Sequence, residues 1–90
     1  MSGLTKFYSV IYQVNSMKLR EMKINQSATI TRVTAPMEMG RRIRDMGITP
    51  GTQIQVIRRA PLLDPVALKL SGFTLTLRNN EADHIEVEIS

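Results

Sequence analysis

The sequence contains no cysteine and only one histidine, His84. The lack of cysteine excludes disulfides, thiolate zinc sites, iron–sulfur clusters and cysteine nucleophiles. A single histidine excludes a multi-histidine metal site within one chain. No apolar run approaches the ~20 residues that a membrane-spanning helix needs. We therefore expect a cytoplasmic protein with no direct membrane insertion.

Aromatic residues are also scarce, and three of the four lie near the start of the chain: Phe7, Tyr8, Tyr12 and Phe73. The formal charge of +4 is unevenly distributed, because residues 1–59 carry +7 and residues 60–90 carry −3. A basic half is compatible with nucleic acid, an anionic membrane surface or an acidic partner protein. Single-stranded nucleic-acid binders normally add aromatic stacking platforms, so the shortage of aromatics weakens that interpretation.

Catalytic motifs are missing as well. The five glycines are scattered, and none forms a phosphate-binding loop. The serines and threonines show no His–acid arrangement, since the only histidine lies near the end of the chain. The sequence thus predicts no catalytic residue, no cofactor and no enzymatic activity.

Ninety residues can build one small core, because a chain of this size buries only about 60–65% of the surface that its unfolded form exposes. We predict an amino-terminal extension over 1–16 and a domain over 17–90. In the extension, Phe7–Val14 is rich in β-forming residues that alternate at period two. It is either an extra strand or a disordered tail, and both alternatives stay open.

The remainder indicates a mainly β fold, because runs rich in Val, Ile, Leu and Thr alternate with Gly/Pro turns. One short helix is expected between the first two strands. Five strands at this spacing favour a small closed antiparallel barrel. The predicted strands cover 27–34, 52–59, 66–70, 73–78 and 85–89, the helix covers 37–46, one helical turn covers 79–84, and 19–26 is a loop.

The helix has recognisable ends. Pro36 suits its first turn, and Gly47 supplies the left-handed residue that ends helices. Gly40 inside it costs about 1 kcal/mol relative to alanine and allows another backbone to approach closely. In the strands we expect Phe73, together with Leu75 and Leu77, to point inward.

Two blocks of sequence, in order and at a defined spacing, carry a family resemblance. The first is Arg-x-x-Asp-Met-Gly-Ile-Thr-Pro-Gly-Thr over 42–52, and the second is Arg-Ala-Pro-Leu-x-Asp-Pro over 59–65. Together with Gly72, Leu-Arg and Glu-Ala in 77–82, and Ile-Glu-Val-Glu over 85–88, they resemble the FeoA family of ferrous iron transport proteins. The resemblance covers about 19–89. The sequence departs from the family pattern at Leu63, where glycine is usual, and at Ile24-Asn25, where Pro-Gly is usual.

The resemblance implies a five-stranded SH3-like barrel and a cytosolic accessory role in ferrous iron uptake. The implied partner is the FeoB-type membrane iron transporter, which carries a cytosolic GTPase domain. Recruitment to the inner face of the membrane by that partner follows from the same resemblance. A homo-oligomer is left open.

Candidate partner-binding residues combine a basic helix with a proline-framed loop. Arginines could form a basic face for an acidic partner, and apolar loop residues often mark interfaces. Both groups also have ordinary structural interpretations, as a solvated helix face and as a loop tucked over the barrel end. The candidates are Arg41, Arg42, Arg44, Leu62, Leu63 and Asp64, with Arg58 and Arg59 as further members of the basic face.

His84 is the only candidate metal ligand with a side-chain nitrogen. Asp83, Glu81, Glu86 and Glu88 lie near it in sequence, and divalent transition metals accept imidazole plus carboxylates. However, Glu86 and Glu88 should point away from the core, so three ligands are not expected to converge. We predict no metal site and keep His84 as a weak candidate.

The function predicted from the sequence is a non-enzymatic module that binds the cytosolic, GTPase-bearing part of the transporter and modulates its activity. One alternative is a small basic barrel that binds nucleic acid, whose affinity would fall with salt. Another is a stand-alone metal-sensing barrel. Binding assays with the transporter domain, with nucleic acid and with metal ions separate the three.

Overall fold

The structure of the protein, a computed structural model, describes residues 16–60 and 64–90. Phe7–Val14, for which the sequence left an extra strand and a disordered tail open, lies outside the described residues. Six strands form one sheet: β1 (Ser16–Lys18), β2 (Ser27–Val33), β3 (Gln53–Arg59), β4 (Val66–Leu70), β5 (Phe73–Leu77) and β6 (Ile85–Ile89). Three helices accompany them: the 3₁₀ helix η1 (Leu19–Glu21), α2 (Met37–Asp45) and α3 (Asn79–Ala82).

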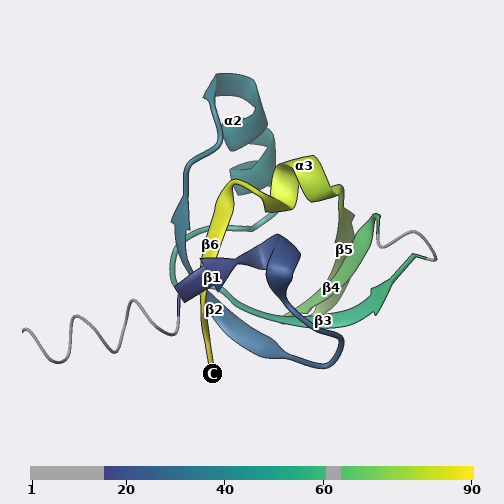
Figure 1. Cartoon of the computed structure of the whole chain (residues 1–90). Helices are drawn as coiled ribbons and strands as arrows, with labels where there is room; N and C mark the ends of the chain where they lie inside the picture. Colours follow the sequence, from purple (N-terminus) through teal and green to yellow (C-terminus); the bar gives the residue numbers. More distant parts are fainter. Residues whose placement is uncertain (1–15, 61–63) are drawn as a thin grey trace, which may run out of the picture.

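All strand pairs are antiparallel, and the strand order is β1-β6-β2-β3-β4-β5. The strands curve around a single interior, with α2 and α3 at one end (Figure 1). The expectation of a closed five-stranded barrel is wrong on two points. A sixth strand, β1, pairs with β6, and the described sheet is open because β1 and β5 are its two edges.

Among residues 16–60 and 64–90, fifteen buried apolar side chains from both halves of the chain form the core. Alternation in β2 and β3 places Ala28, Ile30, Ile54 and Val56 inside. Two register shifts interrupt the ladders, one between Ile30 and Arg32 of β2 and one between Val56 and Arg58 of β3. Such shifts mark an extra residue in one strand, which reverses the face that later side chains occupy.

Residues 19–26 differ from the predicted loop, because η1 opens them. Leu19 and Met22 are almost fully buried in the core. The guanidinium of Arg59 holds this segment against β3 by donating to the backbone oxygens of Arg20 and Met22. The segment is thus part of the domain's packing, although its sequence has no regular apolar period.

The α2 helix begins at Met37, as the sequence indicated, and ends at Asp45, one residue before the predicted end. Pro36 occupies its N-cap, and Gly47 follows its C-cap with φ of 94°. Gly40 is buried, and a Cβ at this position would lie 2.8 Å from the backbone oxygen of Ala35. The predicted close approach of another backbone is therefore confirmed, and it explains why a residue with low helix propensity lies within this helix.

Phe73 corrects a further expectation, because its side chain is not part of the core. It is 48% exposed, whereas Leu77 on the same strand is buried. Phe73 directly follows the two-residue turn at Ser71-Gly72 and lies opposite Leu70 in the strand register. Its ring lies close to the residue after the α2 C-cap, since a Cβ on Gly47 would lie 3.4 Å from Phe73 Cζ.

Candidate partner-binding surface

Three of the predicted contact residues lie on α2, and the structure separates their roles. Arg41 and Arg44 are exposed, and neither forms an ion pair with a described residue. Arg42 instead pairs with Glu81 of α3. Arg41 and Arg44 therefore have their charges available to a partner, whereas part of the Arg42 guanidinium is already engaged.

The Arg42–Glu81 pair has a strongly asymmetric environment. The Glu81 side chain is 7% exposed, while that of Arg42 is 64% exposed. The other carboxylate oxygen, Glu81 Oε1, accepts a hydrogen bond of 3.1 Å from the backbone N–H of Arg78. A buried carboxylate needs such partners, because burying an unpaired charge is costly. Arg42 is thus a structural link between α2 and α3 as well as a surface cation.

Asp64 is the only one of the three loop candidates that the structure describes, because Leu62 and Leu63 lie outside the described residues. Its Oδ1 accepts a hydrogen bond of 2.9 Å from the backbone N–H of Asn79, the first residue of α3. A carboxylate at this point caps an N-terminal N–H that the helix itself leaves unpaired. Asp64 therefore ties the residues directly before β4 to the start of α3.

One hollow on the surface connects two of the predicted contact residues. Its volume is about 830 Å³, and α2, β5, α3 and the residues before β4 line it. Arg42 and Asp64, predicted as contacts from separate sequence motifs, both lie on its wall. Met46 and Arg78 also lie on this wall, and no sequence motif indicates that they neighbour Arg42 and Asp64. Residues far apart in the chain therefore form one continuous surface here.

Two smaller hollows flank Arg58 on the β3-β4-β5 sheet, with volumes of about 270 and 600 Å³. Both are lined by Arg58, Ala67 and Thr76. Ile57, which is 38% exposed, belongs to the larger of the two. Arg58 is exposed and has no ion-pair partner among the described residues. It remains available, whereas Arg59 is engaged with η1.

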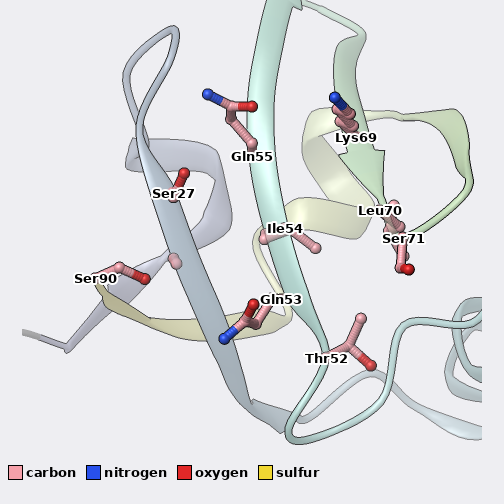
Figure 2. A pocket seen from close by; sticks show the side chains of 10 residues that line it. Ser27, Thr52, Gln53, Ile54, Gln55, Lys69, Leu70, Ser71 and Ser90 are labelled. Carbon is pink, nitrogen blue, oxygen red and sulfur yellow. The ribbon is translucent and has the colours of Figure 1, made fainter.

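A further hollow of about 740 Å³ lies where β2 and β3 extend past the end of β4. Figure 2 shows Gln53 and Gln55 on β3 and Lys69 on β4 around it, with Ser27 and Ser90 on the opposite side. Its lining includes one charged side chain, that of Lys69. None of the predicted contact residues belongs to it, so it does not extend the basic surface.

His84 is half-buried, and the structure gives its backbone rather than its ring a defined role. The His84 backbone oxygen accepts hydrogen bonds from the backbone N–H and the hydroxyl of Thr34, at 2.8 and 3.2 Å. The neighbouring Asp83 is engaged by Arg20, with Nη1 and Oδ2 2.9 Å apart. Within 16–60 and 64–90, no three side chains of metal-binding type lie together in a group that could hold an ion.

The helices give no indication of a membrane span. Across the part of the chain that the structure describes, none is both long enough and apolar enough to cross a bilayer.

Comparison with known proteins gives a family match over most of the chain. Residues 17–89 match the FeoA domain. A curated protein of Porphyromonas gingivalis, named as an Fe(2+) transport protein A/Fe(2+) transporter FeoB fusion protein, is 37% identical over 73 residues. This alignment covers 81% of the chain but only 9% of that relative. The chain therefore spans less than a tenth of the curated relative that it matches.

Solved structures agree with the fold. The solution structure of a FeoA-like protein from Clostridium acetobutylicum is 37% identical with a TM-score of 0.77, covering 83% of this chain and 87% of that one. The FeoA protein of Chlorobium tepidum is 42% identical with a TM-score of 0.75, covering 81% and 70%. A zinc complex of Stenotrophomonas maltophilia FeoA, described as an SH3 domain protein, has a TM-score of 0.70 at 24% identity over 80% and 89%. The fold is thus mainly β and SH3-like.

Proposed function

This chain belongs to the FeoA domain family, and from that premise we propose that it is a non-enzymatic accessory protein of bacterial ferrous iron uptake. In this proposal it works in the cytoplasm and binds the cytosolic, GTPase-bearing part of a FeoB-type transporter. Binding recruits it to the inner face of the membrane, where it modulates the activity of the transporter.

The observation that carries the proposal is the fusion in Porphyromonas gingivalis. There, a segment 37% identical to this chain belongs to a protein whose name joins transport protein A to the transporter FeoB. Fusion keeps two modules at a high effective concentration, which favours contact between them even when their intrinsic affinity is modest. In this proposal, the chain meets the transporter through a surface of its own.

The surface around α2 supplies suitable chemistry for that contact. Arg41 and Arg44 on α2, and Arg58 on β3, are exposed and form no ion pair within 16–60 and 64–90; guanidinium binds carboxylates with two parallel hydrogen bonds. The 830 Å³ hollow places a mixed polar and apolar wall between α2 and α3. We therefore propose an acidic region of the transporter's cytosolic part as the surface that this face meets.

Modulation requires more than binding. A ligand shifts an equilibrium between two states of its target only by the difference between its affinities for them. The accessory role therefore demands that the protein bind the nucleotide-loaded and nucleotide-free transporter unequally. The rigid sheet provides a fixed scaffold on which such a difference can be built.

The decisive experiment is a titration of the full chain against the cytosolic domain of the FeoB-type transporter from the same genome. Calorimetry in the GTP-analogue, GDP and nucleotide-free states should give measurable binding, with affinities that differ between states. Serum albumin serves as the control for nonspecific association. Absence of binding in every state, repeated with the full transporter in membrane vesicles, contradicts the proposal.

A further inference from the structure

The two edges of the sheet are protected to very different degrees. β1 has three residues and ends in Lys18, which makes it a poor template for another strand. β5 has five residues, Phe-Thr-Leu-Thr-Leu, with neither charge nor proline. Within 16–60 and 64–90, only β4 pairs with it. Short length, lysine and proline are the usual means by which proteins block edge pairing, and β5 has none of them.

The register of β4 and β5 determines which backbone groups face outward. Leu70 and Phe73 enclose a two-residue turn, so they form a hydrogen-bonded pair. Such pairs alternate with non-hydrogen-bonded ones along an antiparallel ladder. Thr74 and Thr76 occupy the second kind of position, opposite Lys69 and Ala67. Their backbone N–H and C=O groups therefore point away from β4, toward the open edge.

No described turn, loop or cap hydrogen-bonds to these two threonines. Both residues are exposed. The edge thus presents two donors and two acceptors in the spacing of a strand, together with the half-exposed ring of Phe73. An unpaired strand of this kind is the template on which a further strand can form.

We propose that β5 pairs antiparallel with β5 of a second copy of this chain, around a two-fold axis at Leu75. Thr74 of each copy then lies opposite Thr76 of the other, and their outward groups form four backbone hydrogen bonds. Leu75 lies opposite Leu75, and Phe73 lies opposite Leu77. The two sheets join into one, and the outward backbone groups of both β5 strands are hydrogen-bonded.

The sequence of β5 favours a second copy over an unrelated peptide. In Phe-Thr-Leu-Thr-Leu the two threonines lie symmetrically about the central leucine, and both ends are apolar. Antiparallel self-pairing therefore places threonine opposite threonine and apolar side chains opposite apolar ones. A two-fold interface requires this kind of self-complementarity. No charge on the strand opposes the pairing, and cross-strand Thr–Thr and apolar pairs stabilise sheets.

The hollow beside Leu77 receives the exposed aromatic ring in this arrangement. Its wall includes Met46 and Arg42, which offer a thioether and a guanidinium to an aromatic face. Phe73 of the second copy, placed opposite Leu77, would leave water and contact these two side chains. The interface is confined to strand edges and is therefore small, so we expect a weak, concentration-dependent dimer.

The test is the solution mass of the full chain, measured by sedimentation equilibrium over about two decades of concentration. The mass should rise from 10.2 kDa toward twice that value. A matched pair of variants tests the register. In Thr74→Glu/Thr76→Glu, like charges face each other across the axis and the mass should remain that of one chain. In Thr74→Glu/Thr76→Lys, opposite charges face each other and the dimer should persist.

Hydrogen exchange gives a second measurement that needs no variant. The amides of Thr74 and Thr76 should exchange rapidly in dilute wild-type protein and become protected as concentration rises. If the wild-type chain stays at 10.2 kDa at all concentrations, the proposal is overturned. An extended segment of another protein then becomes the candidate partner of the β5 edge. Equal masses for the two double variants, both folded by circular dichroism, overturn the β5 register. Neither result bears on transporter binding.

Discussion

Arg42 on α2 and Glu81 on α3 form an ion pair across 39 positions of sequence, with the carboxylate almost fully buried and the guanidinium mostly in solvent. The pair fixes the two helices at one end of the sheet (Figure 1). Because Glu81 also accepts from the Arg78 N–H, its two oxygens serve two different purposes. One joins the helices, and the other holds the start of α3.

Removing Arg42 should therefore destabilise the protein more than removing its exposed neighbour. We expect Arg42→Ala to lower the free energy of unfolding by about 1–3 kcal/mol, since it leaves a buried carboxylate short of a partner. Arg41→Ala changes the same charge on the same helix without breaking a described ion pair, and it should stay within about 0.5 kcal/mol of wild type. Urea unfolding measures both, and equal effects would show that the pair contributes nothing to stability.

Gly40→Ala provides a test in which two physical effects have opposite signs. Helix propensity alone favours alanine by about 1 kcal/mol. The added Cβ, however, would lie 2.8 Å from the Ala35 backbone oxygen, and backbone cannot easily move aside. We expect net destabilisation of about 1–3 kcal/mol by thermal or urea unfolding. A more stable variant would mean that the turn before α2 relaxes readily.

Most of the strands could be predicted because they carry a periodic signal of their own. The predicted ranges of 66–70 and 85–89 coincide with β4 and β6, since Pro65 and Ser71-Gly72 bound the first run and the helical turn of Asn79–Ala82 precedes the second. β1 could not be predicted from the sequence because three residues are too few to show a period. Only its pairing with β6 identifies it as a strand. The prediction of a closed barrel was wrong because closure depends on which strands pair, and the strands that pair can be distant in the sequence.

Contacts between distant residues account for the rest of what the sequence could not predict. Arg42 and Glu81 were both recognised in sequence motifs, but nothing in either motif pairs them. Arg59 likewise read as a surface cation, whereas its guanidinium hydrogen-bonds to the backbone of the η1 segment. Side-chain type predicts that an arginine can bind carboxylates or carbonyls. Only the fold determines which arginine is already occupied and which is free.

Charge reversal at a free arginine should weaken transporter binding if α2 forms the contact surface. Arg41→Glu should lower the affinity for the cytosolic domain by about fivefold to tenfold at low salt, because exposed charge pairs contribute up to about 1 kcal/mol each and reversal adds repulsion. Lys23→Glu, a change of equal size in the 19–26 segment, should have little effect. If both variants lose affinity equally, net charge alone attracts the transporter domain and α2 does not form the contact surface. Added salt should reduce the difference between wild type and Arg41→Glu.

Asp64 allows the capping role to be separated from a role in partner binding. Asp64→Ala removes the acceptor for the Asn79 N–H and should cost about 0.5–2 kcal/mol of stability. Asp64→Asn keeps an oxygen acceptor at nearly the same place while removing the charge, so its stability should stay close to wild type. If the carboxylate also meets a cation of the transporter, the asparagine variant should fold normally and bind more weakly. Wild-type affinity in Asp64→Asn, measured by the same calorimetric titration, would restrict Asp64 to its structural role at the start of α3.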